Sequence, residues 1–146
     1  MFQGSQSINL DVKGRVAVPS RYRDVLAAVC EGRLVVTASP YERCLWIYPE
    51  PQWQEVKAKL ESLPNSNKQV RRMQRLVLGN ASELDMDGNG RVLLPPVLRE
   101  FANLDKKVVL VGLGDKAELW SEQGWNEMLE EADDEPMPEA MSNLSL

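Results

Sequence analysis

The chain has 146 residues, 43% of them hydrophobic and 27% charged, which is typical of a globular protein and argues against a disordered one. It contains no histidine, so the commonest general base and the most frequent metal ligand are absent, and we expect neither an enzyme nor a metal or other cofactor. The net charge of −5 is unevenly distributed: residues 1–80 carry 12 Lys and Arg against 7 Asp and Glu, whereas residues 81–146 carry 5 against 15. Phosphate binding depends on a local basic surface, so the acidic average does not exclude a nucleic-acid partner.

Nothing in the sequence indicates export or insertion into a membrane. No apolar run approaches the length of a membrane span, and residues 1–11 lack the basic and apolar regions of a secretory signal. Cys30 and Cys44 show no CxxC spacing, and a reducing compartment is then the simpler setting. We therefore expect a cytoplasmic protein with no membrane partner.

One sequence pattern occurs twice in the chain. LDVKGRVAVPSRYRDVL at 10–26 matches MDGNGRVLLPPVLREFA at 86–102, at a constant offset of 76 residues. Further matching blocks follow in the same order at an offset of 74: 33–36 with 107–110, and 44–46 with 118–120. Several matching segments in the same order are not expected by chance, so the chain consists of two copies of one module.

The first part of each module predicts two short strands joined by a turn. Apolar residues alternate with polar ones over residues 8–12 and again over 16–18. Lys13-Gly14 lies between these runs, and Asn89-Gly90 occupies the matching place in the second module. Asn-Gly between alternating runs is typical of a type I′ hairpin, because both central residues of that turn need a positive φ. We therefore expect a β-hairpin in each module.

A helix and two further strands are predicted to follow in each module. Pro19 and Pro95 end the preceding strand and suit the first turn of a helix. The helices are expected at 20–29 and 96–103, and the strands at 34–37, 45–48, 108–111 and 118–120. Since a unit of about 50–60 residues buries little surface alone, we expect the two modules to share one core.

Two helices are predicted between the modules. The first runs from Pro51 to Pro64, and Asn65-Ser66 can cap the second, which stops near Gly79. One face of the second helix is basic, which is more often a solvated side or a subunit contact than a base-reading surface; it holds Lys68, Arg71, Arg72 and Arg75. The expected boundaries are 5–52 for the first module, 53–80 for the helical segment, 81–124 for the second module and 131–146 for an acidic, disordered tail.

The repeated block D-x-x-G-R-V-x-[VL]-P-x-x-x-R, together with RRMQRLVLGNASE at 71–83, resembles the MraZ family. These bacterial regulators carry two AbrB-type (SpoVT-AbrB) modules and are encoded with cell-division and cell-wall genes. The resemblance covers both modules and the segment between them, and only the tail lies outside it. It implies a mostly β, α+β fold: a split or swapped-hairpin β-barrel built from both repeats.

The resemblance also implies a function. Members of the family are similar in assembling into ring-shaped homo-oligomers in the cytoplasm and on the nucleoid. They bind double-stranded DNA at short direct repeats upstream of their own operon and act mainly as repressors. We therefore expect a sequence-specific DNA-binding transcription regulator.

Arg15 and Arg91 are the first candidates for contact with DNA. Each follows the turn glycine of its module, so its guanidinium should be displayed near a hairpin tip. An arginine in this position can donate two hydrogen bonds to guanine or clamp a phosphate. An ion pair with Asp11 or Asp87 across the turn fits the sequence equally well, and such an acid would also orient the arginine.

The remaining candidates surround the two turns. A lysine on the first turn can contact a phosphate, and a glycine there allows the backbone to approach closely. For Arg23 a contact with DNA and a structural ion pair are evenly balanced. The predicted DNA-binding set is Lys13, Gly14, Arg15, Arg21 and Arg23, with Asp11 as the orienting residue and Asp87, Gly90 and Arg91 as the matching positions of the second module. Because the second turn has Asn89 and acidic neighbours, we expect the second module to bind less strongly.

Two other classes of function compete with a DNA-binding regulator. AbrB-type barrels also occur in antitoxins, and the acidic tail fits such a protein-interaction module, although two fused modules argue against it. An enzyme is disfavoured, because no histidine, catalytic nucleophile motif or phosphate-binding loop is present.

Overall fold

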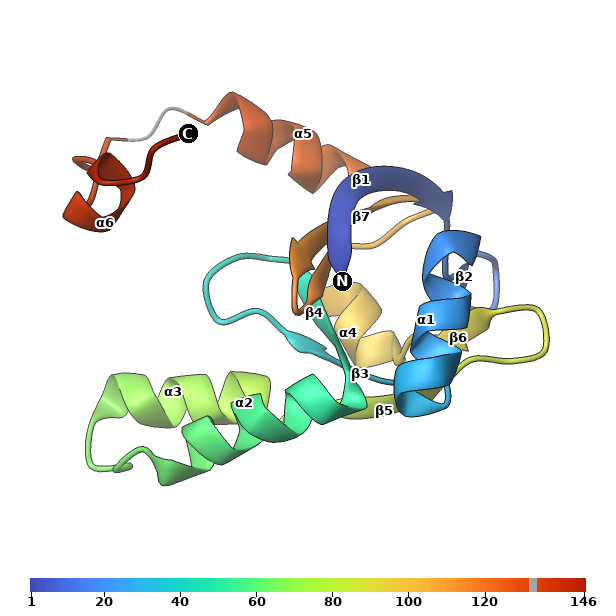
Figure 1. Ribbon diagram of the computed structural model, residues 1–146, viewed down its shortest axis with the longest axis horizontal. Coiled ribbons are helices and arrows are strands. Elements are labelled where there is room, and N and C mark those ends of the chain that lie inside the picture. The colour runs from blue at the N-terminus through green and yellow to red at the C-terminus, as the bar shows by residue number, and fades with distance from the viewer. Residues whose placement is uncertain (132–133) are drawn as a thin grey trace.

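The computed structural model describes residues 1–131 and 134–146 and shows a mixed α+β fold (Figure 1). The strands are β1 (Phe2–Asn9), β2 (Arg15–Ala17), β3 (Arg33–Ala38), β4 (Leu45–Pro49), β5 (Ser82–Asp85), β6 (Arg91–Leu93), β7 (Lys107–Gly114) and β8 (Ala117–Ser121). The helices are α1 (Ser20–Cys30), α2 (Glu50–Ser62), α3 (Lys68–Val77), α4 (Pro96–Phe101), α5 (Glu122–Glu130) and α6 (Glu139–Ser142). Six strands form one antiparallel sheet in the order β1-β7-β8-β4-β3-β5, and β2 and β6 form a separate two-stranded ribbon.

The two modules exchange strands. β1 of the first module pairs along its whole length with β7 of the second, from Phe2 opposite Gly114 to Asn9 opposite Lys107. β5 of the second module pairs with β3 of the first, and β2 pairs with β6. Only the β3–β4 and β7–β8 hairpins stay within their modules, and they join through β4 and β8. Neither module therefore has a complete sheet of its own.

The type I′ hairpins predicted at the two turns are wrong. The strands on either side of each turn pair with the other module instead of with each other. Gly14 and Gly90 have φ values of 88° and 73°, whereas Lys13 and Asn89 are not among the non-glycine residues with positive φ. The expected barrel is also not closed, because the described strands form an open six-stranded sheet, with β1 and β5 at its edges, and a separate ribbon.

The main core lies between one face of the six-stranded sheet and the ribbon, α1 and α4. It draws on both modules, and its largest fully buried side chains are Leu26, Leu45, Leu94, Leu98 and Leu119. The prediction that the two modules share one core is therefore confirmed. Burial of these apolar groups from both halves is the main term that holds the two modules together.

The opposite face of the large sheet is covered by helices at both ends. The α2–α3 pair packs on β3 and β4 through Trp53, Leu60 and Val77, and α5 packs on β7 and β8. Between them, the carboxylate of Glu118 accepts hydrogen bonds from two indoles that occupy equivalent positions in the repeat. The Nε1 of Trp46 donates at 3.2 Å, and the Nε1 of Trp120 donates at 3.0 Å.

The helices between the modules lie close to their predicted positions, but the cap differs. The side chain of Asn67, rather than Asn65-Ser66, accepts hydrogen bonds from the backbone N–H groups of Gln69 and Val70, at 2.7 and 3.4 Å. Helix α5 was not expected from the sequence. The domain boundaries and the disorder of the tail stay predictions; within the tail the structure gives Glu139–Ser142 one helical turn.

Over the described residues, the helices are all too short or too polar to cross a bilayer.

The shared core predicts a sharp contrast between two neighbours on α4. Leu98 is 2% exposed and packs in the core, whereas Val97 is 66% exposed. We expect Leu98→Ala to lower the free energy of unfolding by about 2–5 kcal/mol, because it removes buried methyl groups and leaves a cavity. Val97→Ala, the matched control, should change it by no more than about 0.5 kcal/mol. Denaturant titration of both variants tests this, and equal losses would contradict the proposed position of the core.

Candidate nucleic-acid interface

The loop between β1 and β2 is closed by the carboxylate of Asp11. Its Oδ1 accepts hydrogen bonds from the backbone N–H groups of Lys13 and Arg15, at 2.9 and 2.8 Å. Its Oδ2 accepts from the side-chain Nε of Arg15 at 2.7 Å. One carboxylate therefore fixes both the backbone of the loop and the direction of the arginine side chain.

The loop between β5 and β6 repeats this arrangement. Asp87 accepts from the backbone N–H groups of Asn89 and Arg91 at 2.8 and 3.0 Å, and from the Nε of Arg91 at 3.2 Å. The ion pair that the sequence offered as one reading of Arg15 and Arg91 is thus present in both modules. In each case it uses Nε and leaves both terminal Nη groups able to donate elsewhere.

The same hydrogen bonds hold the pKa of both aspartates below the ordinary value. For Asp11, the largest cause is the backbone N–H of Arg15, and the N–H of Lys13 and the guanidinium of Arg15 add to it. For Asp87, the backbone N–H of Arg91 is the largest cause. These donors favour the charged carboxylate over the neutral acid, so both loops are built around an ionised aspartate.

The two arginines lie on the same face of the β2–β6 ribbon. Arg15 is opposite Leu93, and Ala17 is opposite Arg91. The central pair, Val16 and Val92, is buried in the core. Because side chains alternate along a strand, the four flanking residues point outward, away from that core. Arg15 and Arg91 are therefore diagonal neighbours on the outer face, with Cα atoms about 7–8 Å apart.

Each loop glycine packs against an arginine of the other module. A Cβ placed on Gly14 would lie 2.6 Å from the Cζ of Arg99, and one placed on Gly90 would lie 2.3 Å from the Nε of Arg23. Both glycines also have positive φ, so neither position admits a side chain without strain. The close approach explains why glycine stands at these two positions.

The arginines behind the glycines also bind the backbone. The Nε of Arg23 donates to the carbonyl of Val18 at 2.7 Å, and the Nε of Arg99 donates to the carbonyl of Leu94 at 3.1 Å. Arg23 therefore connects α1 to the end of β2 and supports the loop of the second module. The sequence left a contact with DNA and a structural ion pair equally balanced for Arg23. The observed geometry favours a structural role, but Arg23 fulfils it by donating to a backbone carbonyl and not by forming an ion pair.

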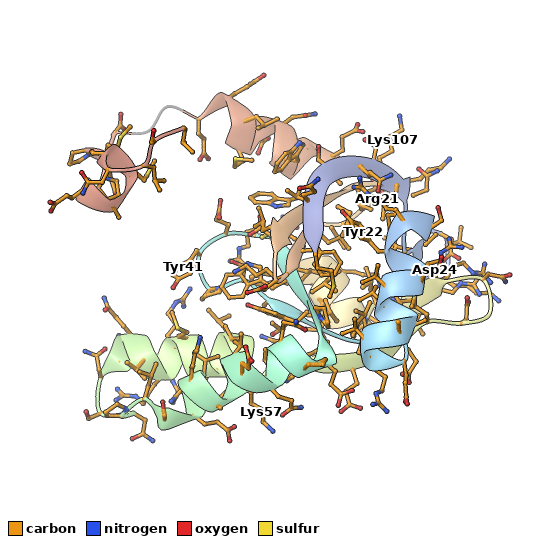
Figure 2. All side chains as sticks on the ribbon, viewed as in Figure 1. Arg21, Tyr22, Asp24, Tyr41, Lys57 and Lys107 are labelled. Carbon is orange, nitrogen blue, oxygen red and sulfur yellow. The ribbon has the colours of Figure 1, made fainter. Side chains whose placement is uncertain are left out.

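Arg21 lies apart from both loops. Its Nη2 donates to the carbonyl of Gln3 in β1 at 3.1 Å, and its guanidinium lies 4.7 Å from the centre of the Tyr22 ring. Figure 2 shows both side chains against the arch of β1. The hydroxyl of Tyr22 donates to the same carbonyl at 2.6 Å. A role for Arg21 in contacting DNA stays a prediction.

The structure thus brings together only part of the predicted set. Arg15, Arg91 and the two aspartates meet at the ribbon, and Lys13 is exposed on the first loop. The sequence favours a structural role for Arg99, but it does not show that Arg99 supports the first loop, and it does not single out the outward-facing Ala17 and Leu93. The repeat offset made Arg99 equivalent to Arg23, but only the strand exchange shows that each serves the loop of the other module. The two loops therefore differ less in charged neighbours than expected.

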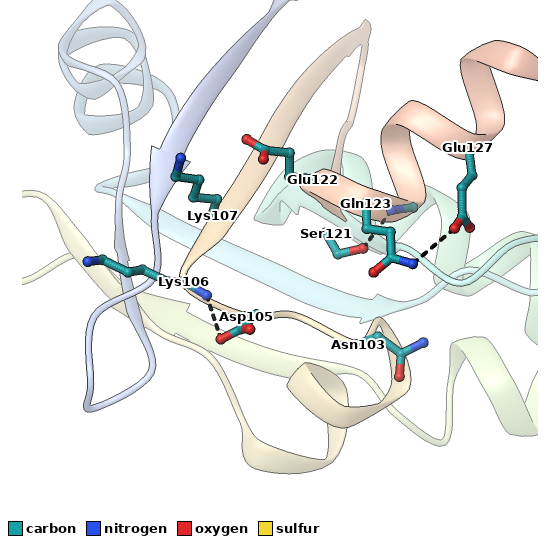
Figure 3. A pocket seen from close by; sticks show the side chains of 9 residues that line it. Asn103, Asp105, Lys106, Lys107, Ser121, Glu122, Gln123 and Glu127 are labelled. Atoms are coloured by element: carbon teal, nitrogen blue, oxygen red, sulfur yellow. Dashed lines mark hydrogen bonds between the residues drawn. The ribbon is translucent and has the colours of Figure 1, made fainter.

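A polar pocket of about 570 Å³ lies elsewhere, between the α4–β7 turn and the start of α5 (Figure 3). Several of its side chains are engaged in local structure. The hydroxyl of Ser121 accepts from the backbone N–H of Gly124 at 2.9 Å and caps α5. Gln123 donates to Glu127 at 3.0 Å. No residue of the ribbon or of the two aspartate loops is among those that line this pocket.

The lowered pKa of the two aspartates predicts how stability depends on pH. A carboxyl whose pKa is lowered by folding contributes stability that is present above its ordinary pKa, here 3.8, and lost as the pH falls through the lowered value. The variant Asp11→Asn/Asp87→Asn should therefore melt below the parent at neutral pH, and the difference should shrink as the pH falls below about 4. Thermal unfolding followed by circular dichroism tests this, and a difference that stays constant down to about pH 3 would contradict it.

Comparison with known proteins agrees with the two-module organisation. The family model described as "MraZ protein, putative antitoxin-like" matches residues 1–76 and again residues 77–145. The chain is 56% identical over 147 residues to the transcriptional regulator MraZ of Saccharophagus degradans, which covers 100% of both chains. It is 52% identical over 147 residues to that of Marinobacter nauticus, covering 99% of this chain and 98% of the relative. The corresponding protein of Pseudomonas aeruginosa is 52% identical over 130 residues, covering 89% and 86%. With both of its modules matched and relatives aligned along its length, the chain belongs to the MraZ family.

Proposed function

We propose that this protein is a sequence-specific DNA-binding transcription regulator that inserts the outer face of the β2–β6 ribbon into the major groove. One observation carries the proposal: Arg15 and Arg91 lie side by side on that face, each with its Nε held by an aspartate. The major groove of B-DNA admits a two-stranded ribbon. A guanidinium whose Nε is already fixed presents its two Nη groups in the arrangement that matches the O6 and N7 acceptors of guanine.

The neighbours of the two arginines suit the same role. Lys13 is exposed at the end of the ribbon, where it can contact a phosphate. Ala17 and Leu93 are exposed apolar residues on the outer face and can contact thymine methyl groups. Gly14 and Gly90 have no side chain, so the backbone of each loop can approach the groove closely. Since one arginine comes from each module, both modules contribute to each binding unit.

The proposed function also includes the mode of regulation and the assembly that we expect from the family resemblance. The protein acts mainly as a repressor of its own cell-division and cell-wall operon, at short direct repeats in the promoter, and is therefore found on the nucleoid. Homo-oligomers arranged as rings present several ribbons at once, so weak contacts at single repeats add up to strong binding. A head-to-tail arrangement of identical subunits suits direct repeats, whereas a two-fold dimer favours palindromes.

The two ribbon arginines should be required for specific binding. We expect Arg15→Ala and Arg91→Ala each to weaken binding to a single repeat by about 1–3 kcal/mol, because each removes a bidentate contact. Lys57→Ala, which removes an exposed charge on α2 far from the ribbon (Figure 2), should leave the affinity unchanged. Fluorescence anisotropy with a one-repeat duplex, repeated over a range of salt concentrations, measures both the affinity and the phosphate contribution.

The outcome also separates the DNA-binding function from the antitoxin-like alternative. If Arg15→Ala and Arg91→Ala fold and assemble like the parent and bind DNA equally well, the ribbon is not the DNA-binding surface. If the protein is instead a protein-interaction module, these two substitutions should not change its affinity for DNA. Circular dichroism and thermal unfolding of each variant control for loss of structure.

The number of repeats should control the affinity of the parent protein. Probes of constant length with one, two and three repeats should bind with increasing affinity, because the second and third contacts form within one assembly. The increase should disappear for Arg15→Ala at protein concentrations that saturate the parent. Equal affinity of the parent for one and three repeats would contradict multivalent binding.

A further inference from the structure

Helix α3 carries a basic face that forms no ion pair with a carboxylate among the described residues. Its ten residues include four basic and no acidic side chains. Lys68, Arg72 and Arg75 are exposed and follow the spacing i, i+4, i+7 along one side. Arg71 donates to the backbone carbonyls of Asn65 and Ser66. Among the described residues, none of the four forms an ion pair with a carboxylate.

Helix α5 has the opposite character. It contains three glutamates and no basic residue, and Glu131 directly follows it. Glu127, Glu130 and Glu131 are exposed beside Leu129, which is 61% exposed. Carboxylates are crowded there: burial raises the pKa of Glu42, and the nearby carboxylates of Glu118 and Glu131 raise it further. The opposite side of α5 is committed to its own sheet through Trp125 and Met128.

One charge at an end of each helix opposes the dipole of that helix. The positive N-terminal end of α3 carries Lys68 and has no acidic residue in its first turn. The negative C-terminal end of α5 carries Glu130 and has no basic residue in its last turn. Charges of these signs at these ends destabilise an isolated helix. Helix stability therefore gives no reason for Lys68 and Glu130, whereas a partner of opposite charge does. Arg75 in the last turn of α3 and Glu122 in the first turn of α5 suit the dipoles of their own helices.

The two helices cannot neutralise each other within one chain. In Figure 1 the α2–α3 pair and α5 extend on opposite sides of the β3–β4 loop, so this loop lies between them. Because Trp125 and Met128 anchor α5 to its own sheet, α5 cannot reach its own α3. The ribbon lies at the other end of the molecule from the α2–α3 turn (Figure 1), so a duplex bound to the ribbon does not cover α3.

We infer that the basic face of α3 binds the acidic face of α5 in a second copy of this chain. The spacings match: Arg72 and Arg75 are three residues apart, as are Glu127 and Glu130, so antiparallel helices can form both pairs together. The contact joins two different surfaces, so each copy keeps one of each free for further copies, and the chain of contacts closes into a ring or continues. This inference rests on the proposed homo-oligomer and identifies the surfaces that build it.

Charge reversal tests the interface. Arg72→Glu/Arg75→Glu and Glu127→Lys/Glu130→Lys should each raise the dissociation constant of assembly by about tenfold or more, because like charges then face each other. The variant with all four substitutions should assemble again, since it exchanges the two charges. Lys57→Glu/Lys59→Glu on α2 is the matched control and should assemble like the parent. Sedimentation velocity at moderate salt gives the mass of each protein.

Two results would overturn the inference: either double variant assembling like the parent, or the fourfold variant remaining dissociated. Thermal unfolding shows whether each variant is folded, and recovery in the fourfold variant cannot arise from misfolding.

Binding to a one-repeat duplex separates this inference from the proposed function. Arg72→Glu/Arg75→Glu should bind that duplex like the parent, whereas Arg15→Ala should not. If the α3 variant loses affinity as strongly as Arg15→Ala while its assembly is intact, α3 contacts DNA and the inference is wrong. If assembly responds as expected but Arg15→Ala binds DNA normally, the interface stands and the proposed DNA-binding surface fails.

Discussion

The fold depends on one constraint: neither module pairs all of its own strands, and β1, β2, β5 and β6 find partners only in the other module. The backbone N–H and C=O groups of β1, β2 and β5 find their partners on β7, β6 and β3 of the other module. Unpaired groups of this kind would be costly once buried, so each module completes the other. The exchange also leaves the segments before and after β2 and β6 without a local partner strand, and there the loops must be held by a side chain.

The aspartate of each loop meets that requirement and prepares the site. A partly exposed ion pair such as Asp11–Arg15, with side chains 32% and 28% exposed, contributes little to stability by itself. Its larger effect is geometric, because the same carboxylate binds two backbone N–H groups and the arginine Nε. The arginine is thus oriented before it meets a ligand, which reduces the entropy that binding must overcome. Arg99 and Arg23 support the same loops from behind.

The sequence predicted local features well and failed on the pairing of strands. The repeat, the helices, the shared core and the two arginines followed from periodicity, proline positions and the offset of 76 residues. The alternation of apolar and polar residues over 8–12 indicates a strand. Because the pattern occurs in both modules, it does not show whether this strand pairs within its own module or with the other one. For that reason the predicted hairpins are wrong, and the sequence does not show that Arg23 supports the loop of the second module. Helix α5 was missed because its anchors, Trp125 and Met128, lie in an acid-rich segment with little apolar periodicity.

The ribbon is nearly symmetric, and its departures from symmetry matter for direct repeats. A ribbon with identical ends could enter a groove in either direction, and a direct repeat requires a fixed direction. Lys13 at one end of the ribbon is equivalent to Asn89 at the other end, and Ala17 on the outer face is equivalent to the larger Leu93. The Nε of Arg15 lies 2.7 Å from its aspartate, whereas that of Arg91 lies 3.2 Å from its own. The first module therefore has the more tightly held arginine and, in the proposed complex with DNA, the stronger phosphate contact. This difference between the two ends arises from residues of the loops and the ribbon. The supporting arginines do not cause it, because the loop of each module packs against one arginine of the other module.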